Sequence, residues 1–161
     1  MLESMSSMDD TTPSFSGTDD LQALVAPPST AVETSNYRLL AMVDIDGMAD
    51  INRELGWQHG NDAIAGVKFL LRSRTPDGDV WRGWRGDKFL ANLEGSDAIM
   101  QWLADLPGLA IRRNRTSVTV CALALNSPTT PDIGLLAACM VKAKRTQRGQ
   151  AYVHDIRIKQ S

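Results

Sequence analysis

The chain has 161 residues and a formal net charge of -2, a length that fits one ordinary domain with a tail. Its two cysteines are too few for the disulfide framework of a small secreted protein, and no apolar run is long enough to span a membrane. The acidic N-terminus lacks the features of a signal peptide, so we expect a cytoplasmic protein with no membrane partner.

Charge is distributed unevenly along the chain. Residues 1–36 hold six acidic residues and no Lys or Arg, which leaves the remainder with 17 basic and 13 acidic residues, or +4. The same segment is rich in Ser, Thr, Asp and Pro, and we predict a disordered acidic tail or linker there. The mildly basic remainder suits a phosphate-bearing ligand but has no basic stripe, so neither DNA nor RNA is expected as a partner.

The N-terminal half of the basic part predicts one strand and two helices. "YRLLAMVDI" (37–45) is a short apolar run typical of a buried strand. "MADINREL" (48–55) predicts a helix closed by Gly56, and the apolar spacing in 61–74 predicts a second helix. Two residues are candidates for the N-cap of this second helix: Asn61 and Asp62.

A hairpin is predicted in the middle of the chain. "PDGD" (76–79) has turn composition, and "VWRGW" (80–84) and "FLANLE" (89–94) read as strands. Arg-Gly-Asp-Lys (85–88) joins them, where Gly tolerates positive φ and Asp bonds its own backbone.

Two helices and two strands follow in alternation. The expected ranges are helix 96–106 capped by Ser96, strand 116–125, helix 131–147 and strand 151–156. The resulting order, β-α-α-β-β-α-β-α-β, predicts an α+β fold in which helices flank a central, mostly antiparallel sheet. We therefore expect one domain over 37–156 and a short C-terminal tail over 157–161.

The predicted topology allows two distant carboxylates to meet at one edge of the sheet. Asp44 lies near the end of the first strand and Asp87 lies in the hairpin turn. Such a pair can hold Mg²⁺ and bridge it to a triphosphate. Taken singly, each has an ordinary explanation, Asp44 as a turn or capping residue and Asp87 as part of a tight hairpin.

Four separated motifs, in this order and spacing, resemble the GGDEF domain of the diguanylate cyclase family. They are "VDIDGMADINRELG" (43–56), "GWQHGND" (56–62), "RGDKF" (85–89) and "VKAKRTQRG" (141–149). The resemblance covers 37–156 and implies the palm-like nucleotidyl-cyclase fold of that family.

The resemblance also implies roles for particular residues. A metal ion, Mg²⁺ or Mn²⁺, would be held by Asp44, the carbonyl of Ile45, and Asp87. Gly86 would let the backbone approach the phosphates, and Asp87 would also help to activate the ribose 3′-hydroxyl. The nucleotide would be bound by Asn52 and Asn61 at the base, and by Lys88, Lys144 and Arg148 at the phosphates. For the last two cations the ordinary alternative is a solvated helix end.

Several positions depart from the family pattern. Lys88 stands where the family has Glu, which replaces a carboxylate beside the metal with a cation. Asn61 stands where the family has a guanine-reading Asp, and an amide offers one acceptor and one donor where a carboxylate offers two acceptors. Trp57 replaces a His, and the Arg of the family's inhibitory product site is missing from 76–79.

We therefore predict a divergent GGDEF-domain protein that binds a purine nucleoside triphosphate, foremost GTP, in cyclic-dinucleotide signalling. Its diguanylate cyclase activity is expected to be weak or lost, so whether it is an enzyme stays open. The alternative is an active diguanylate or hybrid cyclase that joins two GTP molecules into cyclic di-GMP, which requires a homodimer. A second alternative is a module that binds a protein partner and no nucleotide.

Overall fold

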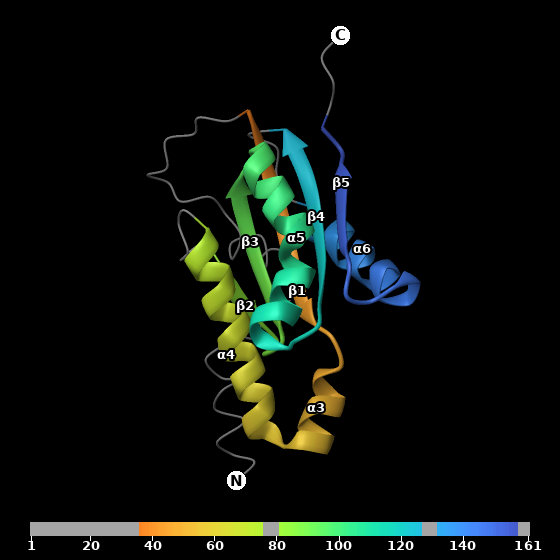
Figure 1. The fold of residues 1–161 in the computed structure, drawn as a ribbon. Coiled ribbons are helices and arrows are strands. Elements are labelled where there is room, and N and C mark those ends of the chain that lie inside the picture. Colours follow the sequence, from red (N-terminus) through yellow and green to blue (C-terminus); the bar gives the residue numbers. More distant parts are fainter. Residues whose placement is uncertain (1–35, 76–80, 127–131, 158–161) are drawn as a thin grey trace.

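The computed structural model describes residues 36–75, 81–126 and 132–157. It shows a five-stranded sheet with helices on both faces (Figure 1). The elements in chain order are β1 (Tyr37–Ile45), α3 (Met48–Leu55), α4 (Trp57–Arg74), β2 (Arg82–Trp84), β3 (Lys88–Glu94), α5 (Asp97–Asn114), β4 (Val118–Asn126), α6 (Ile133–Thr146) and β5 (Ala151–Asp155). No helix in these ranges is long and apolar enough to cross a membrane.

The strand order is β2-β3-β1-β4-β5, with β1 at the centre. Three pairs are antiparallel and the pair of β4 and β5 is parallel, which confirms the predicted α+β fold with a mostly antiparallel sheet. The predicted element order is also confirmed. The expected tails and the 76–79 turn lie outside the described residues, apart from Asn36 and Arg157.

The central strand supplies alternate residues to two separate cores because strand side chains alternate between faces. Leu39, Ala41 and Val43 pack with α4 and α5 on one face. Leu40 and Met42 pack with α6 on the other. Asp44 continues this second series, so its side chain lies on the α6 face at the end of the strand.

Two helix boundaries differ from the prediction by several residues. The helix α4 begins at Trp57 after Gly56, so neither Asn61 nor Asp62 caps it. Gly56 adopts φ 91°, and its carbonyl already accepts hydrogen bonds from the amides of His59 and Gly60, which brings residues 57–60 into the helix. Helices α3 and α4 are therefore joined by a single glycine.

The helix α5 also continues to Asn114, beyond the predicted end at residue 106. Pro107 lies inside it and is buried together with Leu106 and Ala110. The apolar face therefore continues through the proline, and packing against the sheet outweighs the local cost of one lost backbone hydrogen bond. Arg115, which follows the last helical residue and caps the helix, has left-handed backbone geometry.

Gly95→Ala is expected to lower the free energy of unfolding by about 1–3 kcal/mol, the usual cost of overpacking a core. A methyl group there would lie 2.3 Å from carbons of the buried Tyr37 ring. The ring has little room to move because it is packed in the core, and the hydrogen bond from the Gly95 amide to the Tyr37 carbonyl keeps the two backbones close. Chemical denaturation measures the change.

Gly83→Ala on β2 is the control, because an added methyl there meets nothing within 4 Å. Its unfolding midpoint should stay near that of the unchanged protein. Equal midpoints for the two variants would contradict the packing described at Gly95.

Candidate functional site

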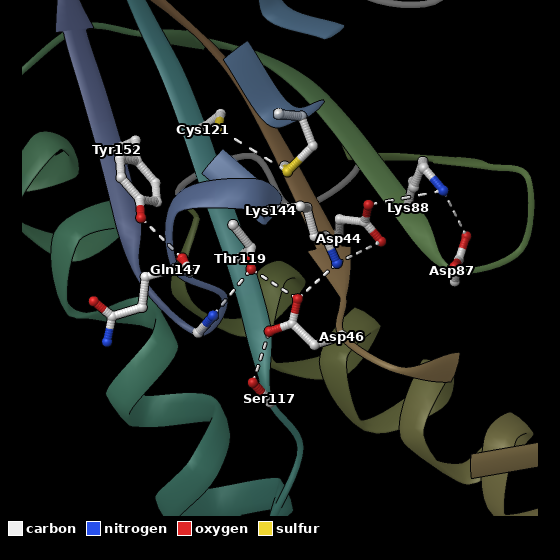
Figure 2. Close-up of polar contacts among 12 residues, drawn as sticks. Asp44, Asp46, Asp87, Lys88, Ser117, Thr119, Cys121, Lys144, Gln147 and Tyr152 are labelled. Carbon is white, nitrogen blue, oxygen red and sulfur yellow. Dashed lines mark hydrogen bonds and ion pairs between the residues drawn. The ribbon is translucent and has the colours of Figure 1, made fainter. Parts of the chain in front are cut away.

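A cluster of charged side chains lies where the end of β1 meets the hairpin turn and the last turns of α6 (Figure 2). The sheet register places the contributors together, since Asp44 pairs with Lys88 on one side and with Thr119 on the other. The backbone amide of Ile45 donates to the carbonyl of Asp87, which fixes the hairpin turn against β1. The structure thus brings Asp44 and Asp87 together, as predicted from topology, and it places Ile45, which the resemblance added, beside them.

The hairpin turn presents Asp87 and Lys88 to the end of β1. Arg85 and Gly86 both have positive φ, 56° and 81°, so the turn reverses over two left-handed residues. The Lys88 ammonium lies 3.1 Å from Asp87 Oδ1 and 3.8 Å from Asp44 Oδ2. One cation therefore bridges the two carboxylates that were predicted to share a metal.

A second ammonium comes from α6. Lys144 Nζ lies 2.6 Å from Asp46 Oδ1 and 3.5 Å from Asp44 Oδ1 (Figure 2). Its side chain is only 18% exposed. Asp44 is therefore held between two lysines, one from each neighbouring element.

Asp46 connects four separate segments. It accepts hydrogen bonds from the hydroxyls of Ser117 and Thr119, each at 2.7 Å, and from Lys144. The Thr119 hydroxyl in turn accepts from the Gly149 amide at 3.0 Å. These bonds tie the ends of β1 and β4 to α6 and to the turn that follows it.

The two carboxyl groups of β1 have pKa values shifted in opposite directions. Burial raises the pKa of Asp44, and the nearby ammonium groups of Lys88 and Lys144 only partly offset this. Burial acts the same way on Asp46, but hydrogen bonds from Lys144, Ser117 and Thr119 outweigh it and hold its pKa below the usual range. The cost of burying a negative charge is thus offset more fully at Asp46 than at Asp44.

An open cleft of about 440 Å³ lies over this cluster, between the hairpin and α6. Its charged lining consists of Asp44, Asp87, Lys88, Lys144, Arg145 and Arg148. Four cations against two carboxylates give the lining a charge of +2, and the cations still outnumber the carboxylates when Asp46 is included. Trp84 and Val141 supply apolar surface in the same cleft. The lining therefore favours an anionic ligand with some flat or apolar surface.

The two residues predicted to read the base lie away from the lining of this cleft. Asn52 is on α3 and Asn61 is on α4, the two helices that follow the turn after β1. The Asn52 side chain lies against Gly60, where a methyl group would come within 1.9 Å of its Oδ1. Asn52 therefore packs directly beside the neighbour of Asn61 at the junction of α3 and α4.

No protein-family model matches the sequence, and no curated protein matches it. Solved structures do match. A microbial GGDEF domain described in its interaction with cyclic di-GMP superposes with a TM-score of 0.63 at 18% identity, covering 73% of this chain and 76% of that one. The chain has the fold of a GGDEF domain.

Two further structures agree with this assignment of the fold. An EAL/GGDEF domain protein from M. capsulatus gives a TM-score of 0.60 at 23% identity, over 83% of this chain and 92% of that one. The GGDEF domain of DgcB from Caulobacter crescentus, solved with cyclic di-GMP, gives 0.60 at 18% identity, over 73% and 76%. The sequence resemblance to GGDEF domains thus agrees with the fold.

GGDEF diguanylate cyclases are Mg²⁺ enzymes, but the donor set of this site does not fit a divalent cation as it stands. Lys88 lies between Asp44 and Asp87, and an ammonium about 4 Å from Mg²⁺ would be repelled by roughly 8 kcal/mol at an effective dielectric of about 20. Within the described ranges, no group of three or more His, Cys, Asp or Glu residues could hold a metal ion. The assignment of a metal to Asp44, Ile45 and Asp87 therefore stays a prediction, and it requires Lys88 to move away.

The remaining site residues fall into those that the sequence indicated and those that it did not. Lys88, Lys144 and Arg148 line the cleft, and Gly86 lies in the adjoining turn. Four residues of the site were not predicted from the sequence. They are Asp46, which accepts a hydrogen bond from Lys144, Ser117 and Thr119, whose hydroxyls donate to Asp46, and Arg145, which lines the cleft. Of these four, only Asp46 had a signal in the sequence, because it lies two residues after Asp44 in the first of the four motifs.

Proposed function

We propose that this GGDEF-fold protein binds a purine nucleoside triphosphate, with GTP first among the candidates, and acts as a regulator in cyclic-dinucleotide signalling. Its diguanylate cyclase activity is weak or lost. The observation that carries this proposal is the bridge that Lys88 makes between Asp44 and Asp87. It places a cation where catalysis needs a metal, and it leaves the cleft attractive to phosphate.

Charge and position both support binding of the triphosphate in the cleft. Arg145 and Arg148 line it without a carboxylate partner among the described residues, so their donors are available to phosphate oxygens. Lys144 is held in place by Asp46 and presents a third cation from the last turn of α6, the helix that also carries Arg145. The base would then reach toward Asn52 and Asn61 beyond the turn that follows β1.

Purified protein incubated with each of the four nucleoside triphosphates, in Mg²⁺, in Mn²⁺ and in EDTA, tests the proposal. Calorimetry should show binding of GTP or ATP, while mass analysis of the products should show little or no cyclic dinucleotide. Sustained turnover of GTP would favour the active cyclase. If the protein binds none of the nucleotides, a module that binds a protein partner becomes the better interpretation.

Gly60→Ala is expected to weaken purine nucleotide binding about tenfold, although Gly60 itself does not contact the base in this proposal. The added methyl would displace the Asn52 amide, and loss of one hydrogen bond to the base is worth about 1–1.5 kcal/mol. Titration calorimetry with GTP measures the change.

Gly134→Ala is the matched control, because a methyl at that helical glycine meets only Asp132 Oδ1, at 3.6 Å. Its GTP affinity should equal that of the unchanged protein. If Gly60→Ala also leaves the affinity unchanged, Asn52 does not read the base.

A further inference from the structure

We propose that the cleft binds the phosphates of its nucleotide without a divalent cation, the ammonium groups of Lys88 and Lys144 taking the place of the metal. This inference rests on the proposed nucleotide-binding function. It concerns how the charge of the phosphates is neutralised and how binding responds to Mg²⁺. It follows from three features of the described residues.

The first feature is the position of the two ammonium groups. Each lies within 4 Å of Asp44, and each also contacts a second carboxylate, Asp87 for Lys88 and Asp46 for Lys144. A cation that joins two carboxylates at a strand end and faces an open cleft is placed as a bound metal would be. Here two side chains of the protein, Lys88 and Lys144, occupy such positions.

The second feature is the donor capacity that remains. Lys88 donates a hydrogen bond to Asp87 and Lys144 donates one to Asp46. An ammonium carries three N–H donors, so each lysine has further donors for a phosphate oxygen. Both lysines line the cleft, where such an oxygen would sit.

The third feature is the excess of positive charge in the lining, four cations against two carboxylates. A divalent cation bound to a triphosphate cancels two of its negative charges, which weakens its attraction to a positive surface. The same cation would be repelled by Lys88 and Lys144. The free nucleotide is therefore the better ligand, and Mg²⁺ acts against binding.

Calorimetric titration of the full chain with GTP, in EDTA and in excess Mg²⁺, tests this inference. We expect the affinity in EDTA to be at least threefold higher than in Mg²⁺. Tighter binding in Mg²⁺, or binding only in Mg²⁺, overturns the metal-free mode and leaves the proposed function in place. Absence of binding in both buffers overturns both.

Inorganic tripolyphosphate provides a probe without a base. In EDTA it should displace GTP from the protein, because the cleft recognises phosphate charge. Failure to displace GTP at millimolar concentration would mean that the phosphates are not held in this cleft, and would overturn the inference.

Lys88→Glu reverses the charge that the inference depends on. Its affinity for GTP in EDTA should fall at least tenfold, and Mg²⁺ should now increase binding. Lys68→Glu makes the same charge change on the exposed face of α4 and should bind as the unchanged protein does. Equal behaviour of the two variants overturns the inference.

The added carboxylate in Lys88→Glu could itself disturb folding beside Asp44 and Asp87. Lys88→Met removes the ammonium without adding an anion, and it should also lose GTP affinity in EDTA. Thermal unfolding followed by circular dichroism confirms that each variant is folded before titration. Unchanged affinity of a folded Lys88→Met variant overturns the inference.

Discussion

Lys144→Met is expected to lower both the free energy of unfolding and the affinity for GTP. The substitution keeps much of the side-chain volume and removes the cation that joins Asp44 to Asp46. Breaking a buried ion pair costs about 3–5 kcal/mol, and this site is partly open to water, so about 2–3 kcal/mol is expected at pH 7. Loss of one charge-assisted contact to phosphate should weaken GTP binding about 10- to 100-fold.

The pH dependence distinguishes this cause from a general packing defect. Without Lys144 the burial of both carboxyl groups is less compensated, so their folded-state pKa values rise. A carboxyl whose folded pKa lies above its unfolded value favours folding at low pH, and this contribution is lost as pH rises through the folded pKa. The difference in stability between Lys144→Met and the unchanged protein should therefore shrink as pH falls from 7 toward 4.

Lys142→Met is the control on the same helix, because Lys142 is exposed and does not line the cleft. It should change stability and GTP affinity little. Denaturation at several pH values, with calorimetry at pH 7, measures all of these effects. A stability loss that stays constant with pH would contradict the electrostatic explanation.

The strands could be predicted because their signals are local. The run from Tyr37 to Ile45 is apolar on both faces, which matches a central strand covered by helices on both sides. The end of α5 was predicted less well, because it depends on contacts distant in sequence. The extension of α5 through Pro107 is decided by its burial against the sheet, which no local pattern encodes.

The candidate site shows the same division. The meeting of Asp44 with Asp87 follows from strand order, since the end of one strand and an adjoining hairpin turn share an edge of the sheet. The partners of Asp46 do not follow in this way. Ser117 and Thr119 are 71 and 73 residues away in sequence, and only the register of β1 with β4 aligns them.

Asp46→Asn is expected to lower the free energy of unfolding by about 2–3 kcal/mol at pH 7, because hydrogen bonds to a charged group are worth about 1.5–3 kcal/mol. The carboxylate accepts from two hydroxyls and from Lys144. An amide can still accept through its oxygen, but its NH₂ group would face donors, including the Lys144 ammonium. Lys144 would then lose its closest anchor and the α6 end of the site would loosen.

The sign of the pH dependence follows from the lowered pKa of Asp46. A group with a depressed folded pKa contributes stability that is fully present above its unfolded value, here 3.8, and is lost as pH falls through the folded pKa. The unchanged protein should therefore lose this contribution below about pH 4. Asp46→Asn has no such group, so its stability should fall less steeply in the same range.

Asp50→Asn removes the same charge from an exposed position on α3, where Asp50 pairs only with nearby Arg53 among the described residues. It should change stability by less than about 0.5 kcal/mol, as expected for a surface pair. Urea denaturation of both variants between pH 7 and pH 3 measures the two profiles. Because Asp46 positions Lys144, Asp46→Asn should also weaken GTP binding in EDTA. Restored binding at high protein stability, for example in added sucrose, would show that Asp46 only stabilises the fold and does not position the lysine.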